Sequence, residues 1–262
     1  MSVSAEAPIR AHRLTVLEHE TERVERAPIA PVRFGPLLSV CGLAGGAGTT
    51  TLAYFVALAA ARQSAEPVLV ADTGGPSGGL AAITGAEAPR SLPELAAHLA
   101  AGLPLRGGLY ATAPGGVRVL ATGPEFTSTC AHEQLTRLLE DAREAHGLTV
   151  IDCGTLAREV DRVAAAAATH VAWVIPATAH GMSCGRRVLD ATLQMRGKEL
   201  VVARCDVRQA KAPLRQLRRI AAERPAPLVL VPHLPALDAG KLDHAVEAAQ
   251  VPVQAILGAL RR

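Results

Sequence analysis

The chain has 262 residues, of which 49% are hydrophobic but only 2% aromatic, and its formal net charge is +3. This length suits one α/β domain whose core is built from alanine, valine and leucine, and the small charge by itself implies no polyanionic partner. The five cysteines include no C-x-x-C pair, which argues against a zinc site or a disulfide framework.

Residues 1–36 differ in character from the rest of the chain. They hold five arginines, five glutamates and four prolines. We expect a flexible tail, with a short partner-docking helix over "LTVLEHETERVER" as the alternative. The segment contains no apolar core of a secretory signal, and no later apolar run approaches the roughly 20 residues that span a bilayer. We therefore expect a cytoplasmic protein.

From residue 37 onward, short apolar runs alternate with alanine-rich helical patterns. Strands are predicted at 37–41, 67–72, 117–121, 148–153, 170–176, 199–204 and 227–232. Helices are predicted at 49–63, 91–101, 132–146, 157–168, 181–196 and 211–223. Several strands lack polar alternation, as strands buried on both faces should. The pattern predicts one doubly wound α/β domain over 37–262, with a mostly parallel sheet of about seven strands.

The first strand-to-helix connection, "GLAGGAGTTTLA" at 42–53, has the glycines of a phosphate-binding loop. Such glycines let successive backbone N–H groups converge on a phosphate, and the following helix adds its N-terminal dipole. Thr50 stands where a hydroxyl would bind Mg²⁺. The predicted nucleotide site comprises Gly45, Gly46, Ala47, Gly48, Thr49, Thr50 and Thr51. The alternative is a glycine-rich turn that binds nothing.

This loop resembles the deviant Walker A motif of the ParA/MinD ATPases, which reads K-G-G-x-G-K-[ST]-[ST]. Three later segments are similar to further motifs of that family: "VLVADTGGPSGGLAAITG" at 68–85, "LTVIDCGTL" at 148–156 and "LVLVPHLPALDAG" at 228–240. The resemblance covers nearly all of 37–262 and implies a P-loop NTPase fold that binds ATP or ADP with Mg²⁺. Within the family, the CpaE/TadZ branch also tends to replace the P-loop lysine with a small residue, and it is the nearest resemblance.

The sequence departs from the family motifs where they place charge. The signature lysine falls at Ala44, the P-loop lysine at Thr49, and the second acidic residue of D-x-D at Gly74. Asp72 and Asp152 remain as candidate partners of Mg²⁺ or water, with capped strand ends as the alternative. Losing one preorganised charge typically costs about 10²–10³ in rate. Three such losses predict a pseudo-ATPase. A slow ATPase whose partner supplies the missing positive charge is the alternative.

The resemblance also implies what the protein is for. By likeness to CpaE/TadZ, we expect a localisation or assembly factor for a pilus, a secretion machine or another polarly placed complex, with a protein partner and with homodimerisation left open. The family often reads adenine with an asparagine near the strand at 199–204, but this chain has no asparagine. Arg204 and Asp206 lie there instead, which leaves open whether a base is read.

A basic segment supports a rival function in DNA partitioning. Residues 204–224 hold seven basic and two acidic side chains, and ParA-like proteins bind nucleoid DNA through late basic residues. The candidate DNA contacts are Arg208, Lys211, Arg215, Arg218 and Arg219. The alternative is a solvated helix face. The final segment, 251–262, has only two charges, so we expect a helix that packs on the domain and does not bind a membrane.

Overall fold

A computed structural model of the chain describes residues 35–73, 79–103, 109–121, 130–192, 197–205 and 211–261. All but the last two residues of the predicted tail lie outside these ranges, so the tail and the division of the chain at residue 37 stay predictions. Within the described ranges, no helix is both long and apolar enough to cross a membrane.

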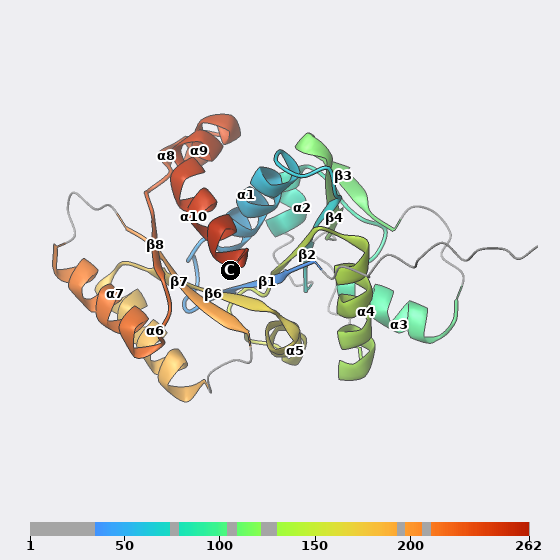
Figure 1. Ribbon diagram of the computed structural model, residues 1–262, viewed down its shortest axis with the longest axis horizontal. Coiled ribbons are helices and arrows are strands. Elements are labelled where there is room, and N and C mark those ends of the chain that lie inside the picture. The colour runs from blue at the N-terminus through green and yellow to red at the C-terminus, as the bar shows by residue number, and fades with distance from the viewer. Residues whose placement is uncertain are drawn as a thin grey trace, which may run out of the picture. The chain divides into compact units, whose positions relative to one another are not determined.

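One eight-stranded sheet lies at the centre of the fold (Figure 1). Its strands are β1 (Leu37–Gly42), β2 (Val68–Asp72), β3 (Ala111–Ala113), β4 (Val117–Leu120), β5 (Leu148–Asp152), β6 (His170–Pro176), β7 (Lys198–Arg204) and β8 (Leu228–Val231). Their order across the sheet is β3-β4-β2-β5-β1-β6-β7-β8, and all neighbours are parallel except the pair β3 and β4. The predicted doubly wound, mostly parallel sheet is confirmed, with β3 as an additional edge strand.

Helices cover both faces of the sheet (Figure 1). They are α1 (Thr49–Ala61), α2 (Gly79–Thr84), α3 (Leu92–Ala100), α4 (His132–Ala145), α5 (Glu159–Ala167), α6 (Ala179–Ala191), α7 (Lys211–Glu223), α8 (Pro235–Asp238), α9 (Leu242–Ala248) and α10 (Gln250–Leu260). The first two and the last three lie on one face, and α3 to α7 lie on the other. Each predicted helix is present, whereas the short helices α2, α8 and α9 were not predicted.

Helix α1 is buried on nearly all sides, because it lies between the sheet and the helices α2 and α10. Its sequence, TTTLAYFVALAAA, is apolar around the whole helix, as a fully enclosed helix requires. Tyr54 and Phe55 are buried with it. The final helix packs against α1 through buried Val253, Ile256 and Leu260. The glycine-rich loop therefore leads into one of the most enclosed elements of the fold.

The strand order places the three predicted site segments together. Strands β2, β5 and β1 are neighbours, so their carboxyl ends meet at one edge of the sheet. In the β-ladder, Asp72 lies opposite Asp152, and Val40 lies opposite Asp152 on the other side. Ligands of open parallel sheets bind beyond this edge.

Candidate functional site

The phosphate-type loop forms between β1 and α1. Gly46 and Gly48 have φ values of 70° and 91°, in the left-handed region that glycine adopts without strain. Gly48 is the N-cap of α1, and no described side chain caps this helix end. A Cβ built at either glycine would meet no described atom within 4 Å. The loop therefore leaves open space in front of the first N–H groups of α1, as an anion site requires.

Two predicted Mg²⁺ ligands meet directly beneath this loop. The Thr50 hydroxyl donates to Asp152 Oδ2 at 2.5 Å, and the Gly154 N–H donates to Asp152 Oδ1 at 3.1 Å. Burial raises the pKa of the Asp152 carboxyl, and the hydrogen bonds from Thr50, Gly154 and Thr49 oppose that rise. Asp72, half-buried, lies in register beside it. The structure thus brings Thr50, Asp72 and Asp152 to one end of the sheet.

This donor set fits Mg²⁺ only as part of a nucleotide complex. Within the described chain, no group of three or more His, Cys, Asp or Glu side chains is placed to hold a metal ion. Mg²⁺ commonly takes one or two carboxylates together with phosphate oxygens and waters. Thr50 and Asp152 would supply the protein part of such a shell, and the nucleotide would supply the rest.

The loop has no lysine at the two positions where the resembled motif has one. Ala44 is partly buried ahead of the exposed Gly45, and Thr49 occupies the first position of α1. The Thr49 side chain lies over Gly42, since its methyl group would be 3.0 Å from a Cβ built there. The first lysine of the chain, Lys198, is the first residue of β7. It therefore lies at the amino end of a strand, whereas the loop lies at the carboxyl ends. Gly74 lies outside the described residues.

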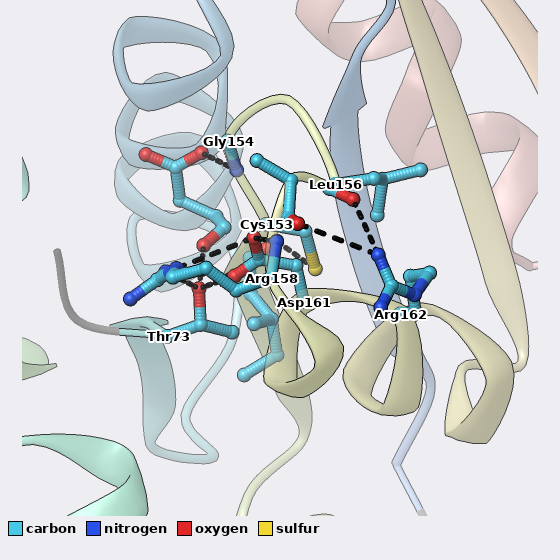
Figure 2. A network of polar contacts seen from close by, with 10 residues as sticks. Thr73, Cys153, Gly154, Leu156, Arg158, Asp161 and Arg162 are labelled. Carbon is cyan, nitrogen blue, oxygen red and sulfur yellow. Dashed lines mark hydrogen bonds and ion pairs between the residues drawn. The ribbon is translucent and has the colours of Figure 1, made fainter. Parts of the chain in front are cut away.

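A second polar cluster, which the sequence interpretation missed, contains Thr73, Arg158 and Asp161 (Figure 2), and Thr73 contacts the Asp152 carbonyl. Thr73 directly follows β2, Arg158 precedes α5, and Asp161 lies in the first turn of α5. The side chains of all three are joined by hydrogen bonds (Figure 2). The spacing R-x-x-D at the start of a helix is a local signal of this arrangement, because an acidic third residue can cap the helix. The hydrogen bonds between this pair and Thr73 have no signal in the local sequence.

A pocket beside the loop could receive a base. It has a volume of about 80 Å³, and its walls come from the loop, α1, the ends of β6, β7 and β8, and the segment after β8. Most of its lining is apolar, but Arg204, His233 and Asp238 add polar atoms. Arg204, one of the two residues named in the sequence near the expected base position, lines this pocket, while Asp206 lies outside the described residues. His233 was not predicted, although the motif segment at 228–240 contains it.

Four of the five candidate DNA contacts lie on α7, which covers the face of the sheet opposite α1. Arg215, Arg218 and Arg219 are exposed, whereas Leu217 and Ile220 of the same helix are buried. The Arg219 guanidinium donates to Glu223 at 2.9 Å, which offsets part of its charge. Arg208 and the side chain of Lys211 lie outside the described part of the chain.

We expect the stability difference between the wild type and the Asp152→Asn variant to depend on pH. A carboxyl whose pKa is raised in the folded state stabilises the fold below its unfolded pKa of about 3.9, and this contribution is lost as pH rises through the folded pKa. The Asn side chain does not ionise. The variant should therefore gain stability relative to the wild type between pH 4 and pH 7, measured by thermal unfolding without nucleotide.

The matched control is Asp190→Asn, since Asp190 is exposed on α6. Its stability relative to the wild type should change little over the same pH range. A flat difference curve for Asp152→Asn would show that burial does not disfavour the Asp152 carboxylate.

Comparison with known proteins locates the fold. No protein-family model and no curated protein sequence matches the chain. Among solved structures, it is similar to the MinC:MinD cell division protein complex of Aquifex aeolicus, with a TM-score of 0.68 and 17% identity over 86% of this chain and 96% of that one. Cyanthece apo McdA gives a TM-score of 0.63 and 17% identity, over 83% of this chain and 99% of that one.

A third structure extends the likeness to an enzyme with ligands. The cobyrinic acid a,c-diamide synthase of Mycobacterium smegmatis, with bound ADP and magnesium, gives a TM-score of 0.60 and 20% identity, over 85% of this chain and 94% of that one. At such identities a structural likeness establishes the fold. The chain therefore has the P-loop NTPase fold of the MinD and ParA type.

Proposed function

We propose that this protein is a nucleotide-binding pseudo-ATPase that acts in the cytoplasm as a localisation or assembly factor. One combination of features carries the proposal. The loop retains the backbone and the Thr50–Asp152 pair of a phosphate and Mg²⁺ site, while the positions that would hold cations are Ala44 and Thr49. Binding through N–H groups survives such changes, whereas stabilisation of a transferred phosphoryl group does not.

The proposed ligand is ATP or ADP with Mg²⁺. The phosphates would lie against the N–H groups at Gly46, Gly48 and Thr49, and Thr50 would face the metal. The base would enter the neighbouring pocket that Arg204 and His233 line. A similar fold with bound ADP and magnesium supports this choice.

The proposed action is to bind a protein partner. A domain that keeps its surfaces but loses its catalytic charges can still dock, and a similar fold occurs in a MinC:MinD complex. By its likeness to the CpaE/TadZ branch, the client would be a pilus, a secretion machine or another polarly placed complex, and a homodimer would be the docking unit.

Nucleotide titration tests the first part of this proposal. Mg-ADP and Mg-ATP should bind to the wild type and raise its melting temperature, because a ligand that binds only the folded state stabilises it. Thr50→Ala should weaken the effect of Mg²⁺, while Thr112→Ala, at an exposed position of the edge strand β3, serves as its control. Absence of any nucleotide effect on the wild type would exclude the binding part.

An affinity capture tests the second part. The tagged chain, with and without nucleotide, should retain a defined set of proteins from extract of the source cells, and tagged chain purified alone should reveal the dimer by its mass in solution. Capture of components of one localised machine supports the proposal. Capture of nucleic acid alone contradicts it.

DNA partitioning is the second candidate, because α7 presents exposed Arg215 and Arg218 on one amphipathic helix. Phosphate contacts make affinity fall steeply with salt. Binding to random duplex DNA should therefore be measured at about 50 and 200 mM salt, and again with Arg215, Arg218 and Arg219 changed to Ala. Salt-sensitive binding that these changes abolish would favour partitioning. Absence of binding at low salt would favour the protein-docking function.

A further inference from the structure

The cluster of Thr73, Arg158 and Asp161 connects two segments that are far apart in the sequence (Figure 2). The Thr73 hydroxyl donates to Asp161 Oδ1 at 2.6 Å. Arg158 Nη2 donates to Thr73 Oγ1 at 2.8 Å and to Asp161 Oδ1 at 2.7 Å. The backbone N–H of Arg158 donates to Asp161 Oδ2 at 2.9 Å. Each side chain thus contacts both of the others.

Burial raises the free-energy cost of breaking these contacts. The Asp161 side chain is 3% exposed and the Arg158 side chain 37% exposed, while Thr73 is buried. A buried carboxylate that loses its partner is strongly destabilising, because its charge is then neither hydrated nor paired. The cluster therefore resists opening more than an exposed ion pair would.

The cluster lies where it can control the candidate site. Thr73 follows Asp72 at the end of β2, and its N–H donates to the carbonyl of Asp152 at 3.3 Å. Arg158 ends the loop that begins at Asp152, and Arg162 donates to two carbonyls of that same loop, those of residues 156 and 157 (Figure 2). The contacts therefore join the exits of the two strands that carry the candidate Mg²⁺ partners.

Segments in this position act as switches in many nucleotide-binding proteins. Contacts to the γ-phosphate and Mg²⁺ order them, and hydrolysis releases them. In this chain a guanidinium and a carboxylate of the protein itself already join the two segments. A ligand can shift an equilibrium only through differential affinity for the two states, and contacts within the protein that favour one arrangement oppose that shift.

We propose that Thr73, Arg158 and Asp161 form a latch that holds the chain just after β2, at residue 73, and the loop after β5, residues 153–158, in one arrangement, with or without nucleotide. This inference rests on the proposed function and adds its regulation. Nucleotide stabilises the fold but does not change how these two segments are joined. Arg158 is a positioning residue in this scheme and takes no part in chemistry.

A simple helix cap is the alternative explanation, and the two make different predictions. The backbone N–H of Arg158 and the Asp161 carboxylate cap α5 without Thr73. Thr73→Val keeps the shape of the side chain and the Arg158–Asp161 pair but removes the hydroxyl that joins the two segments. Thr73→Ser keeps the hydroxyl and is the matched control. Arg158→Gln tests the guanidinium itself.

Hydrogen exchange, followed by mass spectrometry on peptides within 68–73 and 153–162, measures whether the segments stay joined. Without nucleotide, the wild type and Thr73→Ser should exchange slowly, and Thr73→Val should exchange at least about tenfold faster in both peptides. Arg158→Gln should do the same if it folds. Saturating Mg-ATP should slow both wild-type peptides no more than it slows a reference peptide of β3 and β4, 111–120, and should slow those of Thr73→Val by more.

Two results would overturn the latch. One is equal exchange in Thr73→Val and Thr73→Ser, which would leave only a helix cap. The other is protection of the two wild-type peptides by Mg-ATP beyond that of the 111–120 peptide, which would make them ordinary nucleotide switches. The nucleotide-free comparison decides the latch even if a parallel titration shows that no nucleotide binds, so failure of the proposed function is recognised separately.

Discussion

With Mg²⁺ and ATP, the purified protein should release phosphate at least about 10²-fold more slowly than a MinD- or ParA-type ATPase assayed beside it. Phosphoryl transfer depends almost entirely on positioning and on charge placed around the transferred group. The loop has Ala44 and Thr49 where the resembled motif has lysines. The Thr49 hydroxyl, moreover, carries no charge, so it does not replace a cation.

Restoration of the charges tests the cause of this low rate. The double variant Ala44→Lys, Thr49→Lys should raise phosphate release, and the addition of Gly74→Asp should raise it further, because each group acts on a different part of the reaction. Thr50→Ala in the restored chain should reduce the gain by removing the hydroxyl that would face Mg²⁺. Phosphate release over time, with the amount of folded protein checked by circular dichroism, gives the comparison.

Turnover of the wild type at the rate of the active reference would refute the pseudo-ATPase. Turnover that appears only with cell extract, and that disappears when the extract is heated, would instead support the slow ATPase whose partner supplies positive charge. The two outcomes are separated by assaying the wild type with and without extract.

Much of the fold could be predicted from the sequence because its strands are apolar runs bounded by helical patterns. The elements that were missed have little local signal. Strand β3 is three residues long, and it pairs with β4 through a turn in which Gly115 and Gly116 have positive φ. Helix α2 has six residues and α8 has four, which is too short for a helical period to show.

The residues of the candidate site likewise fall into those that the sequence predicts and those that it does not. The loop and Thr50 are consecutive in sequence, so a motif predicts them, and Asp152 follows from its place at the end of a buried strand. The contact between Thr73 and Arg158 joins residues 85 positions apart. It exists because β2 and β5 are neighbours in the sheet. The order of strands in a sheet cannot be predicted from the local sequence pattern of each strand. Sequence interpretation therefore found the groups that would bind a nucleotide and missed those that join the surrounding segments.

Replacement of Arg224 by Met should destabilise the fold by about 3–5 kcal/mol, the largest effect we expect from a single substitution. Arg224 Nε and Nη2 donate to the two oxygens of Glu199 at 2.8 and 2.7 Å. Its Nη1 donates to the carbonyls of Leu189 and Thr192 at the end of α6, and its guanidinium lies 5.9 Å from the centre of the Trp173 ring. One side chain thus joins β7, α6 and β6.

The size of the effect follows from burial. The Glu199 side chain is 4% exposed and that of Arg224 13% exposed, so removal of the arginine takes two charge-assisted hydrogen bonds from a buried carboxylate and one donor from two carbonyls. The double variant Glu199→Leu, Arg224→Met should lose less stability than Arg224→Met alone, because it also removes the buried carboxylate that the arginine faces. Arg219→Ala, which breaks the exposed pair with Glu223, should cost less than about 1 kcal/mol.

Urea unfolding of the four proteins measures these differences. If Arg224→Met lost no more stability than Arg219→Ala, the buried pair would contribute little to the fold. If the double variant were less stable than Arg224→Met, the loss would come from packing around the leucine rather than from the buried carboxylate. The ordering we expect, with the single arginine variant least stable, follows from buried charge, because only that variant keeps the carboxylate and removes the guanidinium that faces it.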